Sequence, residues 1–198
     1  MNKKAILISI DGMRPDGIMQ CGNPFVAEMM KKGAYTLNAQ TVEPSVTLPC
    51  HMSMFHSVKP ERHGILTNIY TPQVRPIDGL FEQLSKQRRT SAMFYGWGPI
   101  RDIAQPQSLT HSAYINAYAA ESTDTLLTNK AIETIDLYDP DFTFLYMVET
   151  DEKGGHDNGW MTPEYLQRIS CAVDNVKELL YRYEKTHTII VTADHGGH

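Results

Sequence analysis

The sequence has no long hydrophobic run. None of its 198 residues lies in an apolar stretch near the roughly 20 residues that a membrane-spanning helix needs. The apolar segment closest to the N-terminus, Ala5–Ile10, ends at an acid, and no small-residue cleavage site of the secretory type follows it. We therefore interpret this segment as a strand, and we expect no membrane partner and a cytoplasmic protein.

Cysteine and positive charge are also scarce. The three cysteines, Cys21, Cys50 and Cys171, are odd in number and have neither metal-binding nor redox spacing, which argues against disulfide bonds. The formal net charge of −5 offers no basic surface for nucleic acid or for an anionic membrane. An anionic substrate would therefore need a bound cation to attract it.

Apolar runs of strand length alternate with helical patterns along the chain. This alternation is typical of an α/β fold with a largely parallel sheet, and no repeat or linker divides residues 1–198 into separate domains. The expected strands are Ala5–Ile10, Ala34–Ala39, Ser91–Tyr95, Phe142–Val148 and His187–Thr192. The expected helices are Pro24–Lys32, Pro49–Ser57, Ile77–Arg88, Glu121–Tyr138 and Pro163–Tyr183. Residues 66–76 and 96–120 are expected to form loops or a small insertion over a site.

Acids follow three of the expected strands. Asp11, Asp151 and Asp194 come after apolar runs, and His156 and His195 stand close to the second and third of them. An acid at a strand end is often only part of a turn, but a turn does not need an imidazole. The carboxyl ends of parallel strands share one edge of a sheet, where ligands bind. The mixed Asp/His pattern therefore predicts a metal site suited to zinc, manganese or iron.

Thr47 stands two residues before a proline in "VTLPCH", at the expected start of a helix. Free backbone N–H groups and the positive end of the helix dipole gather there, so Thr47 is either an N-cap hydroxyl or a nucleophile in an anion site. A two-metal site favours the nucleophile, because one metal lowers the pKa of the hydroxyl while both hold the oxygens of a phosphoryl group. His51 and His56, on the same helix, are interpreted as packing or supporting residues.

Four segments in order resemble the motifs of a known family. They are "ISIDGMRPD", "VTLPCH" followed by "PERHGI", "ETDEKGGHDNG" and "VTADHGG". They resemble the alkaline phosphatase superfamily, and within it the type I phosphodiesterase/nucleotide pyrophosphatase branch. The resemblance implies a doubly wound α/β fold with helices on both faces of the sheet, two adjacent divalent metal ions that are usually zinc, and a phospho-threonine intermediate.

The resemblance also implies roles for particular residues. One metal would be held by Asp11, Thr47, Asp194 and His195, and the other by Asp151 and His156. Arg14 and His63 match motif positions as well, and we expect structural roles for them.

Three departures from the family pattern affect the site. Where the family usually has an asparagine that binds a phosphate oxygen, this chain has Cys50, which we assign to substrate binding although a thiol is a weak donor. The spacing from Asp151 to His156 is one residue longer than usual. The second metal normally takes a further histidine downstream, and the sequence stops at His198. We therefore expect a truncated form of a longer enzyme, whose second metal binds weakly.

These observations predict a metal-dependent hydrolase of phosphate diesters or pyrophosphates that acts on a small phosphorylated substrate, with a nucleotide as one candidate. Tyr70, Tyr95 and Trp97 could stack on a nucleobase, or simply pack their loops. A phosphomonoesterase or phosphonate hydrolase with the same metals is one alternative. A non-catalytic remnant that acts as a binding domain is the other.

Overall fold

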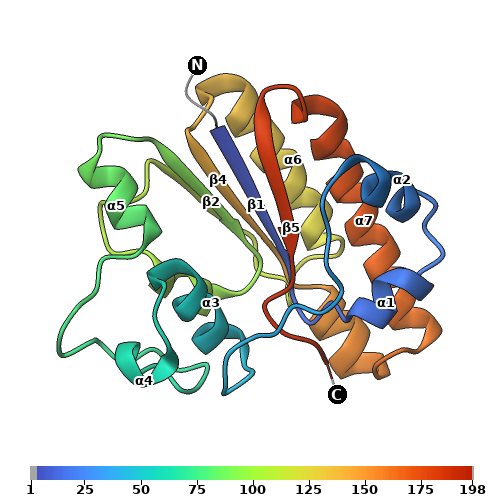
Figure 1. Cartoon of the computed structure of the whole chain (residues 1–198), viewed down its shortest axis with the longest axis horizontal. Coiled ribbons are helices and arrows are strands. Elements are labelled where there is room, and N and C mark those ends of the chain that lie inside the picture. The colour runs from blue at the N-terminus through green and yellow to red at the C-terminus, as the bar shows by residue number, and fades with distance from the viewer. Residues whose placement is uncertain (1–3, 198) are drawn as a thin grey trace.

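A five-stranded parallel sheet with helices on both faces forms the frame of the molecule (Figure 1). The structure is a computed structural model, and it describes residues 4–197. The strands are β1 (Lys4–Ile10), β2 (Ser91–Tyr95), β3 (His111–Tyr114), β4 (Phe142–Met147) and β5 (His187–Thr192). They lie in the order β3-β2-β4-β1-β5, and every neighbouring pair is parallel. The expected α/β class with a parallel sheet is confirmed.

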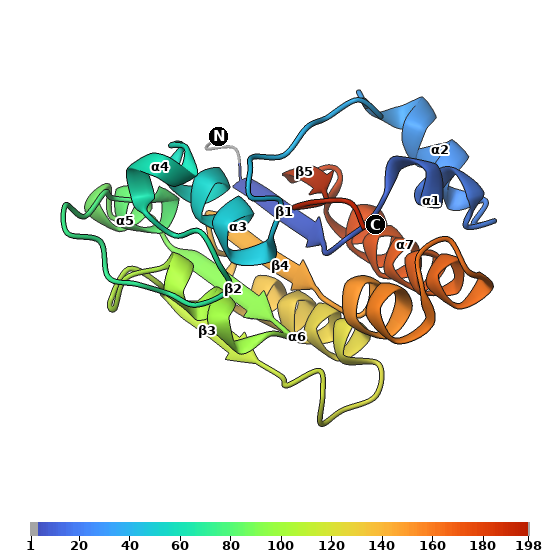
Figure 2. The same cartoon turned by 90° about the horizontal axis from the view of Figure 1, so that it is seen from below.

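The helices form two outer layers. Their bounds are α1 (Pro15–Gln20), α2 (Phe25–Lys32), α3 (Thr47–His56), α4 (Pro60–His63), α5 (Leu80–Lys86), η1 (Gly98–Ile103), α6 (Thr123–Tyr138), η2 (Thr150–His156) and α7 (Pro163–Tyr183). Helices α6 and α7 cover one face of the sheet, and α3, α5 and η1 cover the other (Figure 2). Helices α1 and α2 pack on the outside of α7. Among the described residues, no helix combines the length and apolarity that crossing a membrane requires.

Successive side chains of each strand point to opposite faces, so both faces carry apolar residues. In β1, Ile6 and Ile8 pack toward α6 and α7, whereas Leu7 packs toward α3 and α5. In β4, Leu145 packs toward α6 and α7, whereas Phe144 packs toward α3 and α5. Burial on both faces is what a parallel sheet between two helix layers requires, and it explains why these strands are nearly continuous apolar runs.

One expected strand is wrong. Residues Ala34–Ala39 form no strand, and all of them are exposed. The segment alternates apolar and polar residues, as a strand does, and its Tyr35 and Leu37 are 63% and 36% exposed. A strand also needs a neighbour with which to exchange hydrogen bonds. The described structure provides none for this segment, which runs beyond the edge strand β5.

Some short elements were missed. Strand β3 and the 3₁₀ helix η1 lie inside residues 96–120, which were expected to form loops or a small insertion and for which no element was predicted. Helices α1 and α4 were not predicted either, and each is six residues or shorter. One or two turns give too few residues for a hydrophobic period to be visible. Residues 66–76, by contrast, contain no helix or strand, as expected.

Candidate active site

The first acid of the site follows β1. The backbone N–H of Asp11 donates to Met147 O at 2.9 Å, so the pairing of β1 with β4 continues to the point where the acid begins. The next residue, Gly12, has a φ of +62°, which favours glycine. A Cβ at Gly12 would lie 2.5 Å from Asp151 Oδ1. A residue without a side chain is therefore needed where the ends of β1 and β4 meet.

Asp194 and His195 follow β5 at the same edge of the sheet. Asp194 Oδ1 accepts hydrogen bonds from the backbone N–H of His195 at 2.9 Å and of Gly12 at 3.3 Å. His195 Nε2 lies 3.3 Å from Asp11 Oδ1 and 3.5 Å from Asp194 Oδ2. One potential metal-ligand atom from each of Asp11, Asp194 and His195 lies within 4.8 Å of the others. Three residues that follow two neighbouring strands thus direct potential metal-ligand atoms to a single point.

Thr47 joins this group from α3. Val46 is the N-cap residue and Thr47 is the first residue of the helix, two positions earlier than expected. Proline tolerates the resulting place in the first turn, because no helical partner exists there for an N–H. Thr47 is thus the first helical residue and not the N-cap, and its Oγ1 lies 3.2 Å from His195 Nε2. The N-cap interpretation therefore does not describe this side chain.

His51 supports the same region from one turn further along α3. Its ring is fully buried, with Nδ1 2.8 Å from Thr47 O and Nε2 3.1 Å from Ser9 Oγ. Its Nδ1 also lies 3.5 Å from Asp194 Oδ2. Burial lowers the pKa of His51, which favours the neutral imidazole. A neutral ring donates one hydrogen bond and accepts another, so it can hold the start of α3 against β1.

Asp151 and His156 lie on η2, a π-helix. Its hydrogen bonds include Gly154 N–H to Glu149 O at 3.0 Å, a step of five residues. A π-helix takes more residues per turn than an α-helix, and such turns are frequent at functional sites. It therefore brings residues five apart onto one side, and His156 Nε2 lies 3.2 Å from Asp151 Oδ2. The unusual spacing of this motif is accommodated by helix geometry rather than by a looser loop.

The carboxylates at this edge repel one another. The pKa of Asp11 is raised well above its usual value, mainly by burial and then by the neighbouring Asp194 and Asp151. Burial also raises the pKa of Asp151, while His195 and His156 oppose that change. The Tyr146 hydroxyl donates to Asp11 Oδ2 and satisfies one of its oxygens. The negative charge at this edge therefore favours the uptake of a proton or of a cation.

Three buried oxygens of these acids lack a hydrogen-bond partner among the described residues. They are Asp11 Oδ1, Asp151 Oδ1 and Asp194 Oδ2. A buried acceptor without a donor costs about 1–3 kcal/mol, and more when it is charged. Divalent cations bind such oxygens together with imidazole nitrogens. The residues present therefore fit a metal centre. A buried cluster whose oxygens were all satisfied by hydrogen bonds would not fit one.

The structure thus places the six predicted ligands in two groups, with Asp11, Thr47, Asp194 and His195 in one and Asp151 and His156 in the other. The part of the chain it describes gives the second group two ligands, Asp151 and His156, and His198 lies outside the described residues. Arg14 has structural partners, as expected: it pairs with Asp16 and donates to Gly197 O at 2.8 Å.

Cys50 and Asn68 both make contacts near the start of α3. The Cys50 thiol is buried and accepts from the Thr41 hydroxyl at 3.0 Å, so its assignment to substrate binding stays a prediction. Asn68, in the 66–76 loop, was missed. Its Oδ1 accepts from Leu48 N–H at 3.0 Å, next to Thr47, and the residue is exposed. Neither a periodic pattern nor a neighbouring acid marks it in the sequence; its one signal is that it follows "PERHGI" closely.

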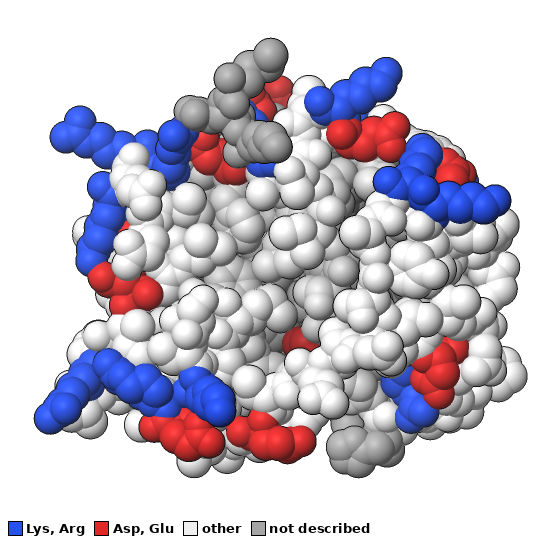
Figure 3. Space-filling view, viewed as in Figure 1, with Lys and Arg blue, Asp and Glu red and all other residues white. Residues whose placement is uncertain are grey.

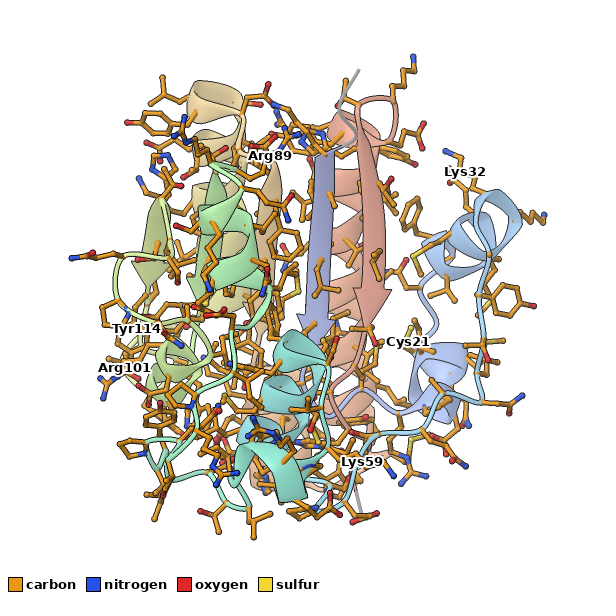
Figure 4. All side chains as sticks on the ribbon, turned by 60° about the vertical axis from the view of Figure 1, so that its left-hand side comes forward. Cys21, Lys32, Lys59, Arg89, Arg101 and Tyr114 are labelled. Carbon is orange, nitrogen blue, oxygen red and sulfur yellow. The ribbon has the colours of Figure 1, made fainter. Side chains whose placement is uncertain are left out.

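Charged side chains of both signs lie mostly around the rim of the face seen in Figure 3, and few lie in its middle. Strands β2 and β3 both end in a tyrosine, and the rings of Tyr95 and Tyr114 stack with centroids 5.3 Å apart. Tyr114 is 47% exposed and is labelled near Arg101 in Figure 4, across the sheet from Cys21 and Lys32. These rings offer a flat apolar surface.

Comparison with known proteins identifies relatives of the chain. The family model described as "Type I phosphodiesterase / nucleotide pyrophosphatase" matches residues 5–198. The rat ectonucleotide pyrophosphatase/phosphodiesterase family member 1 is 26% identical over 96% of this chain and 24% of its own length. The human bis(5'-adenosyl)-triphosphatase ENPP4 is 24% identical over 98% of this chain and 47% of its own length.

A solved structure shares the fold. The murine ectonucleotide pyrophosphatase/phosphodiesterase 5, an inactive threonine-to-alanine variant in complex with AMP, superposes with a TM-score of 0.81 and 23% identity. The match covers 98% of this chain and 57% of that one. The chain therefore spans between a quarter and somewhat more than half of the length of these relatives.

Proposed function

The chain belongs to the type I phosphodiesterase/nucleotide pyrophosphatase family, and from this we propose that it hydrolyses phosphate diesters or pyrophosphates with Thr47 as the nucleophile. One observation carries the proposal. Thr47 Oγ1 lies 3.2 Å from His195 Nε2, at the edge of the sheet where three buried carboxylate oxygens lack hydrogen-bond donors among the described residues. A hydroxyl next to a cation site, at a helix N-terminus, is placed to attack an anion.

Two divalent ions, which we propose are zinc, complete the site. Asp11, Thr47, Asp194 and His195 would hold one, and Asp151 and His156 the other. When bound, such ions lower the pKa of a coordinated hydroxyl and neutralise charge on a phosphoryl group. The second group has two side-chain ligands within residues 4–197, so we propose that its ion is the weaker bound.

The chain's own residues position the reaction. Thr47 Oγ1 forms a bond to phosphorus as the bond to the leaving-group oxygen breaks, and water later hydrolyses the phospho-threonine. His51 holds the backbone of Thr47 through Thr47 O. Asn68 is fixed by its carbonyl oxygen to Leu48 N–H, which leaves its amide N–H groups free to donate to a phosphate oxygen beside the nucleophile.

A nucleotide is the substrate class we favour. The ENPP5 structure contains AMP, and ENPP4 is named for a dinucleoside triphosphate. The stacked pair Tyr95–Tyr114 offers an aromatic surface for a base.

Turnover of two model substrates tests the reaction class. The zinc-loaded protein is expected to hydrolyse bis-p-nitrophenyl phosphate with a higher kcat/KM than p-nitrophenyl phosphate. The proposed substrates carry two substituents on the reacting phosphorus, one that leaves and one that stays, and a diester has both. The reverse preference would favour the phosphomonoesterase alternative. Absence of turnover of both, with two ions bound, would favour the non-catalytic alternative.

Metal binding should release protons. The pKa values of Asp11 and Asp151 are raised in the metal-free protein, so these carboxylates keep a proton to a higher pH than usual, and a binding cation displaces it. Because protons compete, the stabilisation by zinc, about 2.7 kcal/mol at a hundredfold excess over Kd, should shrink as the pH falls from 7.5 to 5.5. Calorimetric titrations in two buffers of different ionisation enthalpy measure the release. Equal heats in both buffers would contradict it.

A further inference from the structure

Two buried carboxylates join the N-terminus of α6 to the end of β4. Asp124 Oδ1 accepts from Val148 N–H at 2.9 Å, and Asp124 Oδ2 accepts from Glu149 N–H at 3.1 Å. In return, Glu149 Oε1 accepts from Thr123 N–H at 3.0 Å. Each carboxylate thus satisfies backbone donors of the other segment. We call Asp124 and Glu149 the carboxylate clasp.

The clasp lies directly before η2. Val148 and Glu149 lead into Thr150, where the π-helix that carries Asp151 and His156 begins. Lys153, on η2 itself, donates to Glu149 Oε1 at 2.6 Å and to Ala120 O at 2.9 Å. The clasp and Lys153 therefore fix η2 against the segment that precedes α6.

Holding these two acids together is unfavourable for the fold alone. Asp124 and Glu149 are 3% and 6% exposed. Burial, followed by the negative charge of Glu149, raises the pKa of Asp124 to about 7, while Lys153 and the two backbone N–H groups oppose that change. Arg168 of α7 faces Glu149 Oε2 at 3.8 Å. Two like charges are thus held together in a buried place, where Lys153, Arg168 and backbone N–H groups offset their repulsion.

We propose that Asp124 is a positioning residue for the ion held by Asp151 and His156. This inference rests on the proposed function. By fixing Val148 and Glu149, Asp124 sets where η2 starts and therefore where Asp151 and His156 point. Asp11, Asp194 and His195 follow other strands, β1 and β5, so the ion that they hold does not depend on the clasp. Loss of groups that orient metal ligands typically weakens metal affinity 10- to 100-fold.

Cobalt titration of Asp124→Asn tests this, with Co²⁺ absorption as the signal. The wild-type protein should take up Co²⁺ in a tight and a weak phase. In Asp124→Asn the Kd of the weak phase should rise 10- to 100-fold, with a changed spectrum, while the tight phase stays the same. The melting temperature of the metal-free variant should stay within a few degrees of wild type, because a lost hydrogen bond is offset by the removal of a buried charge.

Asp141→Asn is the matched control. Asp141 also accepts from a backbone N–H, that of Thr90 at 2.9 Å, and it flanks the other end of β4. It pairs with Arg89, which Figure 4 labels at the end of the sheet opposite Lys59. Its replacement should change neither cobalt phase. Glu149→Gln provides a second variant of the clasp. It should weaken cobalt binding in the same phase. The loss of binding free energy in the double variant should be smaller than the sum of the losses in the two single variants.

The outcomes separate the inference from its premise. An unchanged weak phase in both Asp124→Asn and Glu149→Gln would overturn the positioning role, and so would an equal weakening of both phases. A wild-type protein that binds no cobalt would instead contradict the metal centre itself.

Discussion

Replacing Thr47 by alanine is expected to lower kcat by about four to six orders of magnitude, the scale seen when a nucleophile is removed. The metal ions and the fold should be retained, because Asp11, Asp194 and His195 still present their donors to one point. Thr47 is not the N-cap residue of α3, so the free energy of unfolding should change by less than the roughly 1 kcal/mol that loss of a cap costs. Single-turnover kinetics and thermal unfolding measure the two quantities.

Two further variants sharpen this prediction. Thr47→Ser keeps a hydroxyl and should retain measurable turnover with a phosphorylated intermediate. Thr41→Ala removes a hydroxyl that contacts Cys50 instead of His195, and it should leave kcat within a few-fold of wild type. Substantial activity in Thr47→Ala would refute the nucleophile and direct attention to attack by water.

Asp11→Asn should have opposite effects on metal binding and on stability. The amide is a poor metal ligand, so affinity for the tight ion should fall at least a hundredfold, and activity with it. The metal-free variant should be more stable than the metal-free wild type by about 1–3 kcal/mol at pH 7.5, because a buried acceptor without a donor is replaced by a neutral group. Tyr146 can still donate to the amide oxygen.

The pH dependence of this gain has a definite sign. The pKa of Asp11 is raised in the folded state, so between its unfolded and folded values the folded protein binds more protons. Stability of the wild type therefore falls as the pH rises through that range, and the asparagine variant lacks this loss. The gain should be near zero at pH 4 and grow toward neutral pH. The exposed Asp174→Asn is the control, with no such trend expected. A destabilised Asp11→Asn at pH 7.5 would contradict the repulsion described above.

Long apolar segments could be predicted well from the sequence. The bounds of β2, β5 and α7 agree with expectation, because each has a complete hydrophobic period and clear flanking residues. Thr162 caps α7, and Pro163 takes its first position. Ala34–Ala39 shows the limit. Its apolar and polar residues do alternate, but a strand forms only where a neighbouring strand is available to pair with it. The local sequence does not indicate whether such a strand is present.

The site could be predicted as far as its residues follow strand ends. Asp11 and Asp194 meet because β1 and β5 are neighbours, a consequence of parallel pairing that their positions suggested. The π-helix was not predictable, since its five-residue step conflicts with any ordinary helical period. Asn68 was missed for a different reason: its only structural mark is a hydrogen bond to Leu48, twenty residues earlier in the chain.

The place of β1 in the sheet has a consequence for synthesis on the ribosome. The strand is made first, yet it lies between β4 and β5, so that Ile6 is beside Thr143 and Ile189. At about 5–20 residues per second, the nascent chain carries this apolar segment without its partners for on the order of 10 s. Such long-range pairing also slows folding after release. Among the strands of this sheet, β1 is therefore the one that a chaperone would need to shield longest.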